Sequence, residues 1–147
     1  MYDTILIPYD GSDEAKNGAK HGIELAAALG SSVHALYVID LPGVPRAPAL
    51  RDDEEQLRRE YEEYGEKIMA EISAVAAQHG VDCSAEIRSG SVSDRIVEYA
   101  DREDIDAIVM GSAYRGKLGN LLGGTTDKVV RSATVPVITK RMNADEL

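Results

Sequence analysis

The chain has 147 residues, a length that fits one domain and leaves little room for a second. Its 44% hydrophobic and 29% charged residues are typical of a soluble globular protein. The formal net charge of −10 argues against a nucleic-acid groove, because neutralising phosphates requires clustered lysines and arginines. Cys83 is the only cysteine, which excludes an intramolecular disulfide and a cysteine-based metal site.

The N-terminal segment MYDTILIPYD differs from a secretory signal, since Asp3 stands where basic residues are expected and no long apolar run follows. No segment approaches the roughly 18 apolar residues of a membrane span. We therefore expect a cytoplasmic protein with no membrane partner and no nucleic-acid partner.

The N-terminal third predicts two strands around one helix. An apolar run at Thr4–Pro8, ended by proline and DGSD, is typical of a buried strand. Helical spacing of apolar residues follows at Asp13–Leu29, where Ser12 or Asp13 is a candidate N-cap and Gly30 a candidate stop. Val33–Ile39 predicts a second strand, and the three prolines of Leu41–Leu50 predict a loop.

The clearest predicted helix follows this loop and is ended by Gly80. Its apolar stripe recurs at spacings of three and four and comprises Leu57, Tyr61, Tyr64, Ile68, Ile72, Val75 and His79. We expect this stripe to lie in the core, with His79 partly buried, and the acidic run RDDEEQLRREYEE to be solvated. The alternative is that the stripe extends into a subunit contact.

The rest of the chain alternates strand and helix again. Strands are expected at Cys83–Ile87, Asp106–Met110 and Thr134–Thr139, and helices at Ser93–Glu103 and from Thr125 or Thr126 through Val130. This alternation predicts an α/β fold, a doubly wound five-stranded parallel sheet with helices on both faces. Such sheets bind ligands beyond the carboxyl ends of their strands, where the strand order reverses.

The segment MGSAYRGKLGNLLGGTTDKVV follows the fourth predicted strand and nearly contains a phosphate-binding P-loop. Gly111, Gly116 and Lys117 match the pattern G-x-x-x-x-G-K-[ST], but Leu118 stands where the magnesium-binding hydroxyl is required. The GGTT sequence that ends at Thr126 is a better anion site, because a helix that begins there exposes main-chain N–H groups and two hydroxyls. Gly111 also lets the main chain approach a ligand closely. An ordinary surface loop with a glycine N-cap explains the same residues equally well.

Several segments resemble the universal stress protein family. ILIPYDGSDEA resembles the opening of that family, ALYVID its second strand, IRSGSVSDRIVEYADREDIDAIVMGS a helix and the fourth strand, and DKVVRSATVPVITKR its ending. The match covers about residues 2–141. It implies one Rossmann-like domain at residues 1–141, followed by a polar tail at residues 142–147.

The ATP-binding members of this family carry G-x2-G-x9-G-[ST] after the fourth strand. By resemblance, Gly111 is the first glycine, and Gly124 with Thr125 is the closing pair. The second glycine falls on Tyr114 and the next loop glycine on Lys117. A tyrosine does not take a positive φ cheaply, and its ring is large enough to enter the nucleotide space.

The resemblance also implies a set of nucleotide-binding residues. These are Pro8 and Asp10 at the ribose and adenine, the main chain of Val38 at the adenine, and Gly111, Gly124, Thr125 and Thr126 at the phosphates. A shifted loop would add Gly116, which stands near the positions where the family has its loop glycines. Arg115 and Lys117 are candidate charge partners of the phosphates. The implied ligand is ATP, with Mg²⁺ held through the phosphates.

We therefore predict a regulatory or stress-response module that binds ATP. A slow ATPase is the alternative in a different class, but no clear general base stands beside the phosphates, and no catalytic residue is expected. A third alternative is a family member that has lost nucleotide binding and works through contacts with an unidentified protein. Tyr114 keeps this alternative open.

The last predicted strand favours a homodimer. In a doubly wound order it lies at one edge of the sheet, where N–H and C=O groups are unpaired. Val135, Val137 and Ile138 are apolar, and Pro136 removes one donor. Two-fold symmetry lets two such edges cover each other, and the family resemblance points the same way. The alternative is a monomer whose tail folds over the edge.

We predict that Tyr114 weakens nucleotide binding without abolishing it. Replacing Tyr114 with Gly restores the family spacing and removes a positive-φ cost of about 1 kcal/mol, so ATP affinity should rise about fivefold. Calorimetric titration of both proteins measures the change. Weaker ATP binding by the Tyr114→Gly protein would show instead that the ring contacts the nucleotide.

Overall fold

Five parallel strands form one sheet in the part of the chain that the computed structural model describes, residues 1–41, 51–112 and 124–143. The strands are β1 (Thr4–Pro8), β2 (Ser32–Ile39), β3 (Cys83–Ser89), β4 (Ala107–Ser112) and β5 (Val137–Arg141). Their order is β3-β2-β1-β4-β5, so the direction of winding reverses between β1 and β4. This arrangement confirms the predicted doubly wound parallel sheet.

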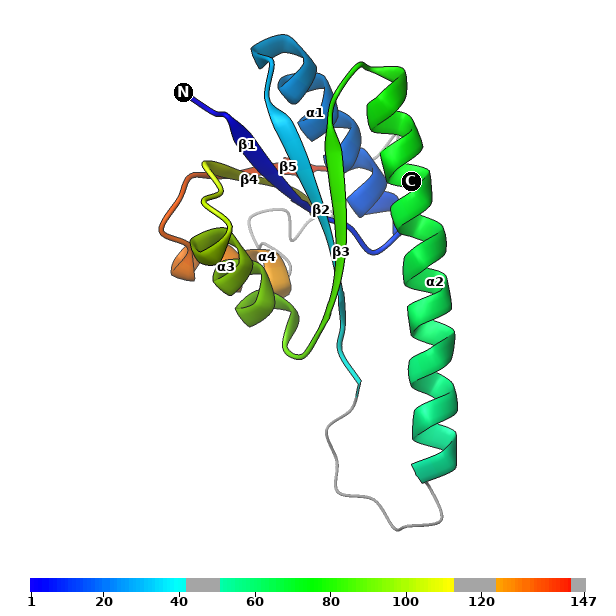
Figure 1. The fold of residues 1–147 in the computed structure, drawn as a ribbon. Coiled ribbons are helices and arrows are strands. Elements are labelled where there is room, and N and C mark those ends of the chain that lie inside the picture. Colours follow the sequence, from blue (N-terminus) through cyan, green and yellow to red (C-terminus); the bar gives the residue numbers. More distant parts are fainter. Residues whose placement is uncertain (42–50, 113–123, 144–147) are drawn as a thin grey trace.

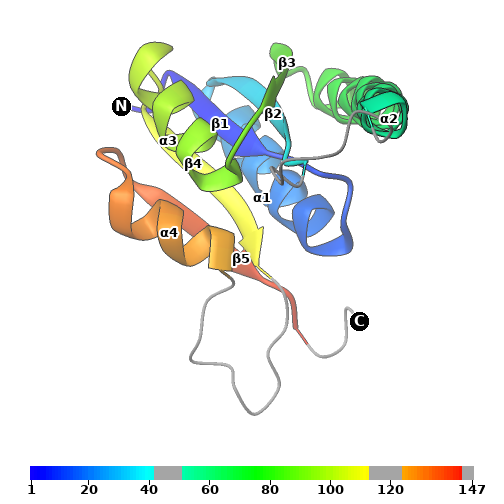
Figure 2. The same ribbon diagram turned by 90° about the horizontal axis from the view of Figure 1, so that it is seen from below.

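Two helices cover each face of the sheet. They are α1 (Asp13–Leu29), α2 (Arg51–Gln78), α3 (Val92–Arg102) and α4 (Gly124–Ser132). Helices α1 and α2 lie on one face and α3 and α4 on the other (Figures 1 and 2). None of these described helices combines the length and the hydropathy that crossing a bilayer requires.

The core consists of two clusters, one on each face of the sheet. Successive residues of β1 alternate between them: Ile5 and Ile7 pack under α1 and α2, whereas Leu6 packs under α3. All three side chains are fully buried, as expected for a central parallel strand with helices on both sides.

The ends of α1 follow from its sequence. Ser12 is the N-cap, and its hydroxyl accepts a hydrogen bond from the N–H of Ala15 at 3.2 Å. Gly30 ends the helix in a left-handed conformation with φ 72°, which a residue with a side chain adopts at a cost. The predicted bounds of this helix are confirmed.

Helix α2 begins ahead of its apolar stripe. It starts at Arg51, at the beginning of the acidic run, and Figure 1 shows its first turns extending beyond the ends of β2 and β3. Ile68 and Ile72 are each 2% exposed, because they face the sheet. Those two residues are the core part of the stripe.

The remainder of the stripe was wrongly assigned to the core. Leu57, Tyr61, Tyr64 and Val75 are between 37% and 39% exposed, because helical spacing defines a face but not what lies opposite it. His79 is exposed as well, beyond the end of the helix, and its Nδ1 lies 3.0 Å from the carbonyl oxygen of Val75.

Strand β5 starts three residues later than predicted. Thr134 does not join the sheet, because its hydroxyl donates a hydrogen bond to Asp101 Oδ1 at 2.8 Å, next to α3. Pro136 precedes the strand, and its carbonyl oxygen accepts from the N–H of Ile108 at 2.9 Å. Proline therefore costs no hydrogen bond within β5. The edge position of this strand is confirmed.

Met142 and Asn143 are the described residues after Arg141. Met142, the first residue of the expected tail, is buried, and its N–H donates to the carbonyl of Ser112 at 3.1 Å. Three segments lie outside the described residues: 42–50, which is most of the predicted loop, 113–123 and 144–147. The second of these contains Tyr114, Arg115, Gly116 and Lys117.

We expect Gly18→Ala to destabilise the fold. A Cβ at Gly18 would lie 2.2 Å from the main-chain nitrogen of Gly111 on β4, so α1 would have to shift. This overpacking should lower the free energy of unfolding by about 1–3 kcal/mol, although alanine favours a helix over glycine by about 1 kcal/mol.

Urea denaturation of Gly18→Ala measures this change, with Gly124→Ala as the control. A Cβ at Gly124 meets no heavy atom within 4 Å, and its variant should stay within about 0.5 kcal/mol of the parent. A Gly18→Ala protein as stable as the parent would contradict the proposed packing.

Candidate functional site

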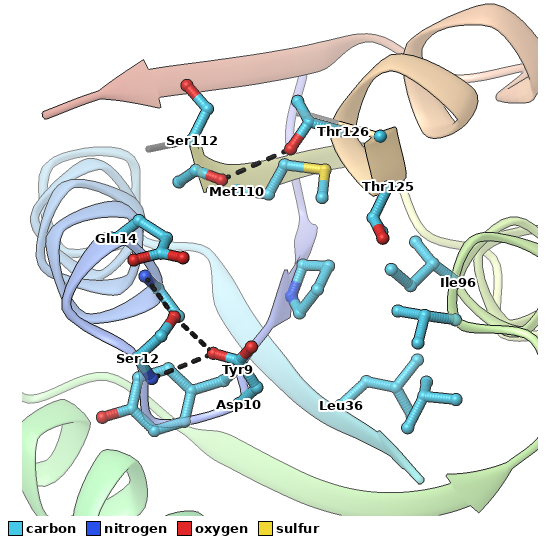
Figure 3. Close-up of a pocket in the computed structure, with 16 residues that line it drawn as sticks. Tyr9, Asp10, Ser12, Glu14, Leu36, Ile96, Met110, Ser112, Thr125 and Thr126 are labelled. Atoms are coloured by element: carbon cyan, nitrogen blue, oxygen red, sulfur yellow. Dashed lines mark hydrogen bonds between the residues drawn. The ribbon is translucent and has the colours of Figure 1, made fainter. Parts of the chain in front are cut away.

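A cavity of about 300 Å³ opens where the strand order reverses, at the carboxyl ends of β1 and β4. Its walls come from those two strand ends, β2, α3 and the first turns of α1 and α4. In Figure 3, Asp10, Ser12 and Glu14 lie on one side of the cavity, and Leu36, Ile96 and Thr125 lie on the other. The position is the one at which parallel α/β sheets bind their ligands.

One wall of the cavity is apolar. Leu36 and Val38 come from β2, Met110 from β4 and Ile96 from α3, and all four side chains belong to the core cluster on the α3–α4 face. Pro8 adds the end of β1. Such a wall suits a flat, weakly polar ring, since most of a ligand pocket is apolar.

The main chain of Val38 faces this space. The N–H of Tyr9 donates to Leu36 at 2.8 Å, which ends the pairing of β1 with β2, and the N–H of Gly90 donates to Ile39 on the β3 side at 3.0 Å. Because alternate residues of a strand direct their main-chain groups to opposite neighbours, Val38 presents its N–H and C=O where β1 has already ended. A ligand edge that carries both donors and acceptors would match them.

The start of α4 forms a polar wall. Gly124 and Thr125 are exposed at the first turn of the helix, whose N–H groups have no partner within the helix. Thr126 is buried, and its hydroxyl donates to the carbonyl of Gly111 at a long 3.5 Å. That hydroxyl ties α4 to β4, so the first turn of α4 offers its main chain and Thr125 to a ligand.

Asp10 follows β1, and its carboxylate is held by Ser12, two residues later in the sequence. Its Oδ1 accepts from the N–H of Ser12 at 2.9 Å and from the Ser12 hydroxyl at 2.5 Å. Its Oδ2 makes no hydrogen bond within the described residues. Asp10 therefore presents one carboxylate oxygen in a fixed position to the cavity.

Gly111 serves a purpose that the sequence did not indicate. A Cβ there would lie 1.7 Å from the carbonyl oxygen of Glu14, so the missing side chain lets α1 pack directly on β4. We expected this glycine to make room for a ligand. Gly111 does line the cavity, but the space that its missing side chain leaves is occupied by α1. Gly18, on the other side of this contact, was missed; its signal was the spacing of Gly18 and Gly22, which lie about one helical turn apart on the same face of α1.

The described charges of the cavity are negative. Asp10 and Glu14 line it, and no lysine, arginine or histidine does so among the described residues. Tyr9 also lines it, and burial, followed by the charge of Glu71, raises the pKa of its hydroxyl, which stays neutral at physiological pH. No group of three or more candidate metal ligands occurs in the described part of the chain.

The structure brings most of the predicted site residues together. Pro8, Asp10, Val38, Gly111, Gly124, Thr125 and Thr126 all line this one cavity. Arg115 and Gly116 lie outside the described residues. Sequence reasoning missed the wall residues Leu36, Ile96 and Met110, whose apolar character looked like core alone, and Glu14, which looked like an ordinary first-turn acid.

Comparisons of the sequence and of the structure with known proteins point to the same family. The family model described as "Universal stress protein family" matches residues 1–141. Universal stress protein MJ0531 of Methanocaldococcus jannaschii is 33% identical over 139 residues, 94% of this chain and 81% of that protein. The structure of universal stress protein UspA from Lactobacillus plantarum superposes with a TM-score of 0.84 at 28% identity, covering 95% of this chain and 98% of that one.

Two more distant structures carry nucleotides. A universal stress protein family protein from Arabidopsis thaliana has AMP bound, with a TM-score of 0.71, 22% identity and coverage of 97% and 94%. A universal stress protein in complex with cAMP has a TM-score of 0.70, 23% identity and coverage of 94% and 96%. At these identities the likeness to this chain is one of fold.

Proposed function

Because the chain belongs to the universal stress protein family, we propose that it binds ATP with Mg²⁺ in the cytoplasm as a regulatory or stress-response module. The observation that carries the proposal is the composition of one cavity. An apolar wall with strand main chain, a carboxylate oxygen that has no hydrogen-bond partner among the described residues, and a helix N-terminus meet there. The AMP and cAMP complexes of two relatives by fold add support for an adenine nucleotide.

The nucleoside fits the β1–β2 end of the cavity. An adenine ring stacked against Leu36, Val38 and Ile96 would bury its faces on apolar side chains. The main chain of Val38 supplies a donor and an acceptor for the edge of the ring. The free Oδ2 of Asp10 can accept from a ribose hydroxyl, as a carboxylate is an acceptor only.

The phosphates fit the start of α4. The main-chain N–H groups of the first turn and the positive end of the helix dipole attract anions. Gly124 leaves this approach open, since a Cβ there meets no heavy atom within 4 Å. Mg²⁺ held by the phosphates would compensate charge near Asp10 and Glu14, and this is the chemistry that the metal supplies.

Replacing Gly124 with Val should weaken ATP binding at least tenfold. The branched side chain would occupy the space in front of the first N–H groups of α4, while the fold is kept because no described atom is displaced. Isothermal titration calorimetry with ATP measures the affinity. Ser132→Val, an exposed change at the other end of the same helix, is the control and should bind like the parent. A folded Gly124→Val protein with unchanged ATP affinity would remove the start of α4 from the site.

We further propose that the chain forms a homodimer through the β5 edge. Within the described residues β5 pairs only with β4, so one side of its main chain has no partner strand. The carbonyl of Pro136 and the N–H of Met142 both bond to β4, which directs the N–H groups of Val137, Thr139 and Arg141 outward.

Thr139→Pro should abolish this dimer while keeping the monomer folded. Thr139 is exposed, and proline there removes an outward N–H without affecting the ladder to β4. Sedimentation at micromolar concentration compares this variant with Thr139→Val. A parent protein that sediments as a 15.9 kDa monomer would refute the dimer, and a dimer that survives Thr139→Pro would refute this interface.

A further inference from the structure

Helix α2 reaches the turn that presents Asp10. The hydroxyl of Tyr64 donates a hydrogen bond to the carbonyl oxygen of Asp10 at 2.7 Å. The next residue, Gly11, has φ +79°, and a Cβ on it would lie 2.2 Å from the Tyr64 hydroxyl and 3.1 Å from Ile68 Cγ2. The turn after β1 is therefore shaped against α2, and glycine at position 11 makes room for the tyrosine.

The Tyr64 hydroxyl is placed by packing, although the side chain is 39% exposed. Its ring meets the buried ring of Tyr37 edge to face, with the centroids 5.8 Å apart and an interplanar angle of 71°. Gly65 lets α2 approach closely at this point, since a Cβ there would lie 2.7 Å from Tyr37 Cδ2. Packing between α2 and β2 therefore fixes the position of the Tyr64 hydroxyl beside the turn that contains Asp10.

Two different elements hold Asp10. The Ser12 cap of α1 binds its carboxylate, and Tyr64 of α2 binds its carbonyl. Burial raises the pKa of the Tyr64 hydroxyl, and the charges of Asp10 and Glu71 act in the same direction, so the hydroxyl keeps the proton that it donates. Tyr64 therefore supplies a hydrogen bond from α2 to the turn that carries the cavity's carboxylate.

We propose that Tyr64 is a positioning residue of the nucleotide site, which holds the Asp10 turn in its binding geometry and couples occupancy of the cavity to the packing of α2. This inference rests on the proposed nucleotide binding. Coupling of this kind is reciprocal: if Tyr64 strengthens nucleotide binding, bound nucleotide strengthens the contact of α2 with the turn. The first turns of α2 extend past β2 and β3, and the helix also carries the exposed Leu57 and Tyr61, so that α2 would then report the state of the cavity.

The test compares Tyr64→Phe with Tyr61→Phe. Both tyrosines lie on α2 and are 39% exposed, both variants keep the ring, and only Tyr64 holds the Asp10 carbonyl. Loss of one neutral hydrogen bond at a partly exposed position should weaken ATP binding about three- to fivefold in Tyr64→Phe, and less than about 1.5-fold in Tyr61→Phe. Calorimetry at 25 °C, on variants whose folded state is checked by circular dichroism, measures the affinities.

Amide hydrogen exchange supplies a readout that a purely structural role would not change. ATP should slow exchange around Tyr64 in the parent and in Tyr61→Phe, but not in Tyr64→Phe. Equal ATP affinities in all three proteins, or protection of α2 that persists in Tyr64→Phe, would overturn the coupling and leave nucleotide binding intact. A parent protein that binds no ATP would overturn the proposed function and this inference together.

Discussion

The main chains of α1 and β4 meet with no side chain between them. A Cβ on Gly111 would lie 1.7 Å from the carbonyl oxygen of Glu14, and one on Gly18 would lie 2.2 Å from the nitrogen of Gly111. Because Ser12 and Glu14 begin α1, this contact fixes the start of the helix against the end of β4. The distance between Asp10 and the start of α4, and hence the width of the cavity, depends on it.

The rest of the site follows from strand order and alternation. The strand order extends from β1 in one direction and from β4 in the other, so α1 and α4 lie on different faces of the sheet. Both helices follow the carboxyl ends of parallel strands and therefore start at the same edge of the sheet. Alternation then directs Leu36, Val38 and Met110 toward α3 and α4, where they form the apolar wall. The polar groups of the cavity come from the carboxyl ends of strands and from the first turns of helices.

The sequence predicted an element correctly when the residues that set its ends lie next to it in the chain. It failed when contacts with residues distant in the sequence set the ends or the burial of an element. Helix α1 was predicted to its bounds because its cap and its stop lie next to it in sequence. Strand β5 was not, because Thr134 bonds to Asp101, 33 residues away. Periodicity identified the apolar face of α2 but could not show that Leu57 and Tyr61 on that face are exposed. Likewise, nothing near Tyr64 indicates that it binds Asp10, 54 residues earlier.

The charge of the site limits what the cavity attracts. The chain carries a net charge of −10, and the described charged groups of the cavity, Asp10 and Glu14, add to it. An anionic ligand therefore finds its attraction in the main chain, at the open N–H groups of α4, and not in described side chains. If the proposed ATP binds here, such a site would favour a polyphosphate that brings its own cation over a bare one, since the metal would be attracted by the carboxylates while the phosphates bind the helix. Under this proposal Mg²⁺ would help to select the ligand, and ATP affinity should depend on the divalent cation more steeply than AMP affinity.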